Sequence, residues 1–547
     1  MSAAGADRLL VVHYHLQPGG VTTVIRDGLS ALLASERANW LRELVVVAAG
    51  AGRRHTDPTH HDPLLQALRA AQARNRQSTT AVTVAIEPAL AYRSRSRPAE
   101  QERLLQALRD RYGDALWWVH NYHLGKNTAL TGAVLRAAAV GQRMLLQIHD
   151  FPECGRLDNL RQLTRDCGAH RYPRGANVGY VTINRRDGDI LRGAGLPKAA
   201  VLLLPNPVAA PTSAPAMPGD APSVAARGLL LSAQRRAWWS GRIEPERPLW
   251  LYPVRARRRK NVLEAALLAT LAEANLLVTL PALSAAERCY GRVVRRAYEA
   301  GRIAGAYGIG DMPPEAGLSF DDLVQAADLV VSSSIEEGFG YAYVSALQWG
   351  RPLLARRLHV AADLGELLAE GPGLLYERVA TPVTARERQD AYRAHRRVGA
   401  AAPAVTPALT PTLDFAQLPL PVQRSVLQRA SEPAYRRELA DANATLLSDL
   451  RRLQLPLECY AAPAARSTAP AARSVAAIDA ALGPARFAER AAQLLAALRT
   501  TSGGDVSREG QSPSASASLP AKREGSIEAA VEAQFDTPET ARMLVAG

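Results

Sequence analysis

The sequence predicts an α/β protein made of two doubly wound domains. Three times, an apolar run of strand character leads into a turn and then into a helix, within residues 9–33, 249–274 and 327–352. The chain has 547 residues, which is more than a single hydrophobic core usually accommodates. A run rich in proline, alanine and serine at residues 208–226 is the natural linker between the two halves.

The first of these segments has glycines where a strand would turn into a helix. Residues 9–12 form the predicted strand, Gly19 and Gly20 form the turn, and the helix begins near Val21. Glycines at such a turn allow the backbone to come close to a phosphate or a sugar. Gly19 and Gly20 are therefore candidate ligand contacts, although many turns of this kind only reverse the chain.

Polar side chains follow another strand-like run in the first half. His120, Asn121, His123, Lys126 and Asn127 all lie in the loop that follows residue 119. A polar loop beyond a buried strand is a suitable place for contacts with an acceptor substrate. The alternative for each histidine is a purely structural role.

A predicted strand at residues 144–148 places His149 and Asp150 at its carboxyl end. Open α/β sheets bind their ligands at this edge, so His149 is a candidate for the site. Asp150 either fixes the tautomer of His149 or caps the next turn.

In the second half, a predicted strand at residues 249–254 leads into a strongly basic turn and an amphipathic helix that begins near Asn261. Arg255 and Lys260 stand five residues apart in this turn. The three arginines between them, residues 257–259, are interpreted as a solvated basic loop in preference to direct ligand contacts.

The third segment joins a short strand, residues 329–331, to a helix through an acidic turn. Gly338 and Gly340 allow a tight turn, and the free N–H groups of the helix that begins at Tyr341 would face a ligand. Glu337 lies at the tip of the turn, where its carboxylate can accept hydrogen bonds from sugar hydroxyls.

Taken together, these segments resemble glycosyltransferase family 4 in order and spacing, from about residue 8 to residue 358. The donor motif of that family is Glu-Gly-Phe-Gly followed by a second Glu after a seven-residue gap. Residues 337–340 match the first part, with Phe339 in third place, and Ser345 occupies the position of the second Glu. The pair Arg255 and Lys260 resembles the Arg and Lys of the family's phosphate segment, although its usual glycines are replaced by Val254 and Asn261.

The resemblance implies the GT-B fold, in which two Rossmann-like domains face a cleft, and hexose transfer from a sugar nucleotide with retention at the anomeric carbon. Arg255 and Lys260 would neutralise the departing diphosphate. Glu337 would contact the donor sugar, and His149 would orient it. Ser345 would hydrogen-bond the ribose, more weakly than a carboxylate does.

The expected site therefore has three groups of residues. The catalytic group is Glu337, Lys260, Arg255 and His149. The donor-binding group is Gly19, Gly20, Phe339, Gly340, Tyr341 and Ser345. The acceptor-side candidates are His120, His123, Lys126 and Asn127.

The expected organisation has five parts. They are an acceptor-side domain at residues 1–207, a linker at 208–226, a donor-nucleotide domain at 227–375, a mainly helical extension at 376–499, and a largely disordered tail at 500–547. Within the extension, the helix at residues 484–498 is a candidate to cross back to the first domain. Residues 527–544 are a further helical stretch to which the sequence assigns no role.

Composition narrows the functional classes. The four cysteines have no paired spacing, so neither a disulfide framework nor a zinc site is expected. No metal or cofactor is expected, because Arg255 and Lys260 can neutralise the diphosphate. A net charge of +14 is compatible with attraction to an anionic membrane surface. Aromatic residues make up only 5% of the chain and no nucleic-acid module is recognisable, so a nucleic-acid partner is not expected. Without a signal segment or a long apolar run, the expected location is cytoplasmic, with peripheral contact to the inner face of the membrane as one option.

The resemblance thus implies a retaining hexosyltransferase that uses a sugar nucleotide and an unidentified acceptor. Two alternatives remain open. One is a catalytically inactive sugar-nucleotide-binding protein on the same scaffold, suggested by Ser345. The other is a different enzyme of the same architecture, such as a sugar-nucleotide epimerase or a phosphorylase.

Overall fold

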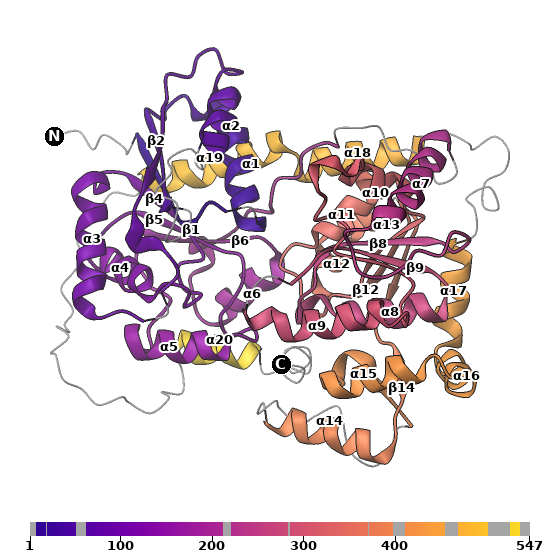
Figure 1. Cartoon of the computed structure of the whole chain (residues 1–547). Coiled ribbons are helices and arrows are strands. Elements are labelled where there is room, and N and C mark those ends of the chain that lie inside the picture. The colour runs from indigo at the N-terminus through magenta and orange to yellow at the C-terminus, as the bar shows by residue number, and fades with distance from the viewer. Residues whose placement is uncertain are drawn as a thin grey trace, which may run out of the picture. The chain divides into compact units, whose positions relative to one another are not determined.

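The computed structural model describes most of the chain and divides it into two compact units. The described residues are 7–17, 19–50, 62–93, 95–211, 220–282, 285–369, 371–397, 411–454, 469–500 and 526–535. The first unit contains Met1–Ala209 together with Asp479–Phe535, and the second contains Ala210–Ile478. Figure 1 shows the sheet of the first unit in indigo and purple, and that of the second in magenta and orange.

The first unit is built on a seven-stranded parallel sheet with the order β3-β2-β1-β4-β5-β6-β7. Its strands are β1 (Arg8–His15), β2 (Glu43–Ala49), β3 (Ala81–Ile86), β4 (Leu116–His120), β5 (Met144–Ile148), β6 (Val178–Thr182) and β7 (Val201–Leu203). Because the strand order reverses between β1 and β4, the loops that follow these strands open a crevice at their carboxyl ends.

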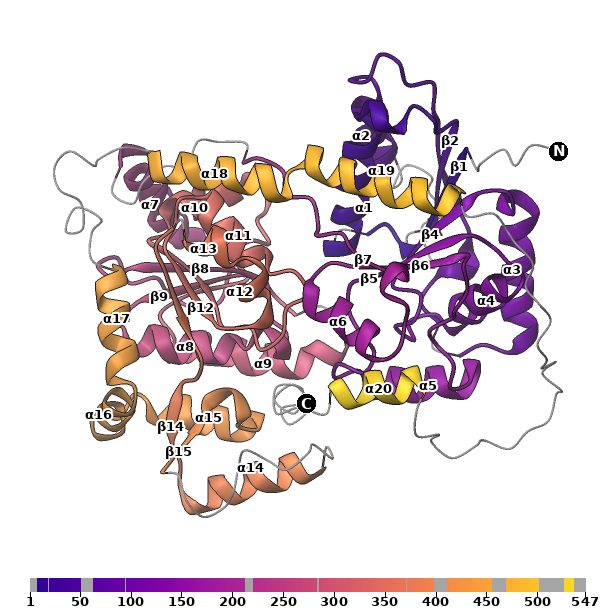
Figure 2. The same cartoon turned by 180° about the vertical axis from the view of Figure 1, so that it is seen from behind.

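Helices cover both faces of this sheet. One face packs against α1 (Gly20–Leu33), α2 (Asp62–Gln72) and α19 (Pro484–Thr500). The other packs against α3 (Pro98–Tyr112), α4 (Thr128–Ala139), α6 (Arg185–Gly193) and α20 (Ile527–Gln534), while α5 (Leu157–Cys167) follows β5. Helices α19 and α20 thus bring residues from the end of the chain onto the first unit (Figure 2).

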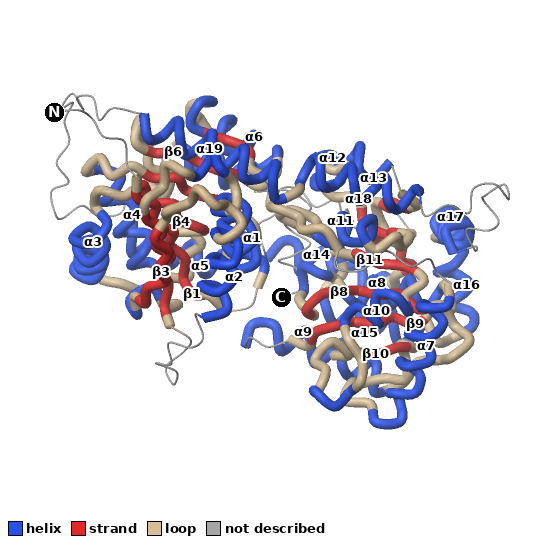
Figure 3. The backbone as a smooth tube through the Cα atoms, turned by 90° about the horizontal axis from the view of Figure 1, so that it is seen from above, coloured by secondary structure: helices blue, strands red, loops and turns tan. Residues whose placement is uncertain are grey.

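The second unit repeats the plan with a six-stranded parallel sheet of order β10-β9-β8-β11-β12-β13. Its strands are β8 (Leu249–Arg255), β9 (Asn275–Leu280), β10 (Gly305–Tyr307), β11 (Leu329–Ser332), β12 (Leu353–Arg356) and β13 (Gly373–Tyr376). Here the order reverses between β8 and β11, which are hydrogen-bonded neighbours. Figure 3 shows the strands of each sheet in red among the blue helices of the same unit.

The helices of the second unit lie on both faces of its sheet. Helices α8 (Val262–Leu271) and α9 (Ala285–Glu299) cover one face, and α7 (Ala221–Ala233) and α10 (Phe320–Ala326) cover the other. Shorter helices follow β11 and β12: α11 (Tyr341–Gln348), α12 (His359–Asp363) and α13 (Gly365–Ala369). Strand β8 is apolar on both faces, with Trp250 and Leu251 pointing to opposite sides. A strand buried on both faces is typical of a parallel sheet.

A C-terminal extension enlarges the core on the side of α8 and α9. It consists of β14 (Ala380–Pro382), α14 (Ala385–Arg397), β15 (Thr412–Asp414), α15 (Leu420–Arg429), α16 (Pro433–Ala442) and α17 (Ala444–Gln454), whereas α18 (Ala469–Leu482) follows later in the chain and contributes none of its described side chains to this core. Val426, Leu439 and Leu450 are buried in the same cluster as the apolar residues of α8. Strands β14 and β15 form a small antiparallel sheet that the sequence analysis did not predict.

The fold class expected from the sequence is confirmed: two Rossmann-like domains of the GT-B class with a mainly helical extension. The linker is shorter than expected, because helix α7 already begins at Ala221, with Pro222 in its first turn. The disorder expected for residues 500–526 falls almost entirely outside the described residues. Among the described helices, none combines the length and the apolar character needed to cross a membrane.

Candidate functional site

The basic turn and the acidic turn of the second unit lie at the carboxyl ends of two neighbouring strands. The basic turn follows β8 and contains a 3₁₀ turn, Arg258–Lys260, before α8 begins. The acidic turn follows β11 and leads into α11. Since the strand order reverses between β8 and β11, both turns stand at the point where open α/β sheets bind ligands.

Lys260 and Glu337 meet across these two turns. The Lys260 ammonium donates to the Glu337 carboxylate and forms an ion pair with it, and the two side chains are 17% and 9% exposed. Burial alone would raise the pKa of Glu337, but the Lys260 ammonium and the Arg259 guanidinium together lower it. Burial lowers the pKa of Lys260, and the Glu337 carboxylate opposes that shift. The fold therefore places a cation and an anion side by side at a position that is largely shielded from solvent.

Hydrogen bonds fix the two turns to each other. The Ile335 N–H donates to the carbonyl of Arg259 at 2.8 Å, and the Ser333 hydroxyl donates to the carbonyl of Asn261 at 2.9 Å. The Tyr252 hydroxyl, on β8, donates to the carbonyl of Lys260 at 2.5 Å. The backbone on either side of Lys260 is thus held by groups from the strands, and so the ion pair is positioned by the fold.

Two residues in these turns adopt the left-handed backbone conformation. Asn261 has φ 49° and ψ 42°, which asparagine tolerates better than most residues. This conformation explains how Asn261 can stand where the resembled family has glycine. Gly340, with φ 83°, precedes α11, and a Cβ there would lie 3.1 Å from the Val360 side chain.

The remaining donor candidates of the second unit lie at the end of β8, in the acidic turn and on α11. Arg255 donates to the carbonyl of Pro281 at 3.0 Å. Phe339 and Tyr341 stack edge to face with ring centroids 4.8 Å apart. Ser345 lies half-buried on α11.

The interpretation of residues 257–259 as a solvated loop is wrong for Arg258. Its guanidinium donates to the side chain of Asn261 at 2.9 Å and to the carbonyl of Ala416 at 2.8 Å. Arg257 does point outward: it is 46% exposed and pairs with Glu287 on α9 at 2.5 Å.

In the first unit, three histidines line up at the carboxyl ends of adjacent strands. His13 lies near the end of β1, His120 ends β4, and His149 follows β5. Nδ1 of His120 lies 3.0 Å from Nε2 of His149, and their rings stack with centroids 5.3 Å apart. The ring of His13 stands edge-on to that of His120 at 6.3 Å. All three side chains are buried.

Burial keeps these histidines neutral. It lowers the pKa of His149 to about 4 and that of His13 to about 3, and it lowers the pKa of His120 well below the ordinary value. A group with so low a pKa is a weak base at neutral pH, but a neutral imidazole can still donate and accept one hydrogen bond each. The row of histidines is thus suited to orient hydroxyl groups and not to remove protons from them.

Asp150 and His149 each have a further partner. The Asp150 carboxylate pairs with Arg156 at 2.7 Å, and the ring of His149 contacts His120. The backbone N–H of His149 donates to the side chain of Asn121, whose left-handed conformation (φ 54°) turns the chain after β4. The role of Asp150 in fixing the tautomer of His149 stays a prediction.

The acceptor-side candidates fall into two groups. Asn127 caps α4, because its side chain accepts from the N–H of Leu130 and donates to two carbonyls, and it has no exposed surface. His123 is completely buried against the rings of Phe151 and Tyr172. Neither side chain has exposed surface, and the acceptor role expected for them stays a prediction.

Lys126, Gly19 and Gly20 remain accessible. The Lys126 ammonium lies 5.4 Å from the ring centroid of Tyr92, whose hydroxyl is 2.8 Å from Nε2 of His15. Gly19 precedes α1, and both glycines are exposed at the start of that helix. Sequence reasoning missed His13 and His15, although their alternation in the strand Arg8–His15 was a readable signal. Within the described ranges, no three His, Cys, Asp or Glu side chains gather in a way that could hold a metal ion.

The buried histidines make the first unit sensitive to acid. His13, His123 and His149 have folded-state pKa values of about 3, 3 and 4, below the ordinary value of 6.5. Between these values and 6.5 the unfolded chain binds the protons, so stability is complete above pH 6.5 and falls as the pH is lowered. Each of the three should lower the free energy of unfolding by roughly 2 kcal/mol at pH 5.

Urea unfolding between pH 8 and pH 5, followed by circular dichroism, measures this loss. The variant His170→Gln is the control, because that side chain is 90% exposed and its replacement removes none of the buried imidazoles. Equal midpoints at pH 7.5 and pH 5 would contradict the assignment of buried neutral histidines.

Comparisons with known proteins give one relative of moderate similarity. No protein-family model matches the chain. The mannosylglucosyl-3-phosphoglycerate synthase of Petrotoga mobilis is 35% identical over 251 residues, which make up 46% of this chain and 48% of that protein. The chain therefore matches about half the length of this curated relative.

Solved structures with the same general plan are more distant in sequence. The Anabaena protein HepE, in complex with UDP and glucose, is 14% identical with a TM-score of 0.48, covering 89% of this chain and 99% of its own. The sucrose-phosphate synthase of Thermosynechococcus elongatus is 14% identical with a TM-score of 0.46, covering 90% and 98%. The fold assignment given above rests on the strand order of the two sheets and not on these similarities.

Proposed function

We propose that the protein is a glycosyltransferase that moves a hexose from a sugar nucleotide to an acceptor hydroxyl, with retention at the anomeric carbon. The observation that carries the proposal is the Lys260–Glu337 pair, held between β8 and β11 where the strand order reverses. A sugar nucleotide needs both partners there: a cation for its diphosphate and a carboxylate for its sugar hydroxyls.

In the proposed reaction, the bond between the anomeric carbon and the diphosphate oxygen breaks as the acceptor oxygen bonds to the same face of that carbon. Lys260 and Arg255 stabilise the charge that grows on the departing diphosphate, with the N-terminus of α11 nearby. The acceptor proton passes to a departing phosphate oxygen. Glu337 holds the sugar, and His149 is assigned an orienting role toward a sugar hydroxyl. No metal or cofactor is assigned, since the cationic side chains supply the charge.

For the acceptor we propose a negatively charged sugar derivative of the phosphoglycerate class. The support is the Petrotoga relative, whose name describes the synthesis of mannosylglucosyl-3-phosphoglycerate. Phosphoglycerate carries a phosphate and a carboxylate, which suit a chain with a net charge of +14. A glucosyl-3-phosphoglycerate acceptor and a mannosyl donor are accordingly the first pair to test.

The experiment is a matrix of donors and acceptors. UDP-, GDP- and ADP-sugars are each incubated with glucosyl-3-phosphoglycerate or with an uncharged glucoside, and both nucleotide release and the glycosylated product are measured. Release with one donor class that depends on the charged acceptor and is lost in Glu337→Ala supports the proposal. Turnover should persist in EDTA, and proton NMR of the product reports the anomeric configuration.

Ser345 supports a second candidate, a sugar-nucleotide-binding protein without transferase activity. Its hydroxyl stands where the resembled family has a charged ribose contact. This candidate predicts that a sugar nucleotide raises the unfolding temperature although no acceptor, including cell extract, leads to nucleotide release. Donor-dependent product formation would exclude it.

A further inference from the structure

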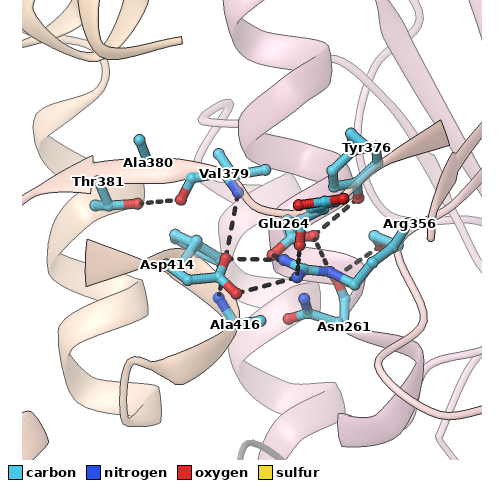
Figure 4. A network of polar contacts seen from close by, with 12 residues as sticks. Asn261, Glu264, Arg356, Tyr376, Val379, Ala380, Thr381, Asp414 and Ala416 are labelled. Carbon is cyan, nitrogen blue, oxygen red and sulfur yellow. Dashed lines mark hydrogen bonds and ion pairs between the residues drawn. The ribbon is translucent and has the colours of Figure 1, made fainter. Parts of the chain in front are cut away.

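A buried ionic network joins the Rossmann core of the second unit to the C-terminal extension (Figure 4). Its centre is Arg356, which ends β12 and is completely buried. The Arg356 guanidinium donates to the Glu264 carboxylate at 3.1 and 2.6 Å, and to the Asp414 carboxylate at 3.0 and 2.9 Å. Glu264 lies in the first turn of α8, and Asp414 ends β15. One guanidinium thus ties the helix that follows the basic turn to the extension.

The network has further partners on both sides. Tyr376, which ends β13, donates to Glu264 at 2.8 Å, and the carbonyl of Glu377 accepts from Arg356 at 2.6 Å. Asp414 also accepts from the N–H of Val379 at 3.2 Å. The Tyr343 hydroxyl, on α11, donates to the carbonyl of Arg356 at 2.5 Å. Arg356 therefore connects both helices that follow the donor turns, α8 and α11, with the extension.

The charges in this network call for a second cation. Two carboxyl groups, those of Glu264 and Asp414, contact the single guanidinium of Arg356, and an unbalanced charge is costly inside a protein. Arg258 is the nearby cation that restores the balance: burial lowers its pKa, and Glu264 and Asp414 are among the groups that oppose that shift. It also donates to the carbonyl of Ala416, two residues beyond Asp414.

Arg258 and Lys260 belong to the same short turn. The 3₁₀ turn Arg258–Lys260 has about three residues per turn, so successive side chains point in different directions. Arg257 points outward to Glu287, Arg258 points inward to the extension, and Lys260 reaches Glu337. When Arg258 is anchored, the turn cannot rotate without moving the Lys260 ammonium away from Glu337.

We propose that the C-terminal extension is a working part of the donor site, and that Arg258 and Arg356 are positioning residues that couple it to Lys260. The term donor site rests on the proposed function. The coupling between the extension and Lys260, however, can be measured without any ligand. The extension contributes the Asp414 carboxylate and the Ala416 carbonyl, and the basic turn contributes Arg258. Neither Arg258 nor Arg356 touches substrate in this scheme.

The test measures the chemical accessibility of Lys260. The chain has only four lysines, Lys126, Lys198, Lys260 and Lys522, so acetylation with acetic anhydride can be followed at each site by mass spectrometry. Exposed Lys198 is the internal reference. Loosening the basic turn should raise the labelling of Lys260 relative to Lys198 by about fivefold or more, because a more frequently opened segment reacts faster.

Two pairs of variants separate coupling from general damage. In the basic turn, Arg258→Ala should raise the ratio of Lys260 labelling to Lys198 labelling, whereas the neighbouring change Arg257→Ala should not. In the extension, Asp414→Asn should raise the ratio, whereas Arg429→Ala, which removes an ion pair with Glu387 inside the extension, should not. The unfolding temperature of each variant shows whether the variant is folded. If Asp414→Asn does not fold, the Lys260 labelling of Arg258→Ala alone decides the proposal.

Activity supplies the second readout. With a donor that the wild type uses, Arg258→Ala should lower kcat by about 10²-fold, since small displacements of a catalytic group have effects of this size, while KM for the acceptor stays unchanged. Lys260 labelling within twofold of the wild type in both Arg258→Ala and Asp414→Asn would overturn the proposal. If the wild type turns over no donor at all, the proposed function fails, and the labelling ratio still decides whether the extension holds the turn.

Discussion

Replacing Lys260 by alanine is expected to lower kcat by about 10²- to 10³-fold, the usual effect of removing one group that stabilises transition-state charge. Lys260 is the cation that the fold holds against Glu337 at the carboxyl ends of β8 and β11. The diphosphate of a sugar nucleotide gains charge as it leaves, so an ammonium at this position acts more strongly on the transition state than on the bound donor. KM for the donor should therefore change much less than kcat. Steady-state measurements of nucleotide release give both constants.

The matched control for this change is Arg257→Ala, which removes a neighbouring positive charge that points away from Glu337 and pairs with Glu287. This variant should retain kcat within about threefold of the wild type, because an exposed ion pair contributes little. The variant Glu337→Gln separates the two roles of the pair: it keeps Lys260 but removes its anion, so it should weaken sugar binding without removing the cation. A fully active Lys260→Ala would contradict the assignment.

The strands that carry the site could be predicted from the sequence because they are buried on both faces. A continuous apolar run such as Met144–Ile148 is readable without knowledge of its neighbours, and the structure has β5 at the predicted residues. The pair β14 and β15 could not be read in this way. Each of these two strands has three residues, and the two are separated along the chain by the helix Ala385–Arg397 and more than a dozen further residues. Tertiary contacts, and not a local sequence pattern, therefore determine them.

The residues of the site could be predicted from the sequence, but the directions in which their side chains point could not. Glu337 was indicated by its place at the tip of a turn between a strand and a helix, and Lys260 by the resemblance of its segment to glycosyltransferase family 4. Their pairing joins residues 77 positions apart, which no local pattern signals. The inward direction of Arg258 was likewise unreadable, since its partner Ala416 is 158 residues away and the three adjacent arginines look alike. Packing in the folded protein decides which of these neighbouring arginine side chains points into the interior.

A second buried ionic network, centred on Arg171, should contribute strongly to the stability of the first unit. Arg171 is 1% exposed, and its guanidinium contacts Glu153 at 3.1 Å and Glu532 of α20 at 3.0 Å. Its backbone N–H donates to Glu528 at 2.8 Å. The side chain of Phe535 then packs against Phe151, two residues after His149, at a centroid distance of 5.2 Å. Arg171 thus holds the last described helix against the loop that follows β5.

The variant Arg171→Met should accordingly reduce the free energy of unfolding by about 3–5 kcal/mol, because it leaves the buried Glu153 carboxylate without its cation. The control Arg37→Ala removes an exposed ion pair with Glu489 on the same unit, at 3.4 Å, and should cost less than about 1 kcal/mol. Denaturant unfolding gives both values. Proteolysis of the folded protein adds a local readout, since the helix Ile527–Gln534 should become cleavable in Arg171→Met before the rest of the unit unfolds. A loss below about 1 kcal/mol in Arg171→Met would mean that the apolar contacts of Ile527, Val531 and Phe535 hold α20 on their own.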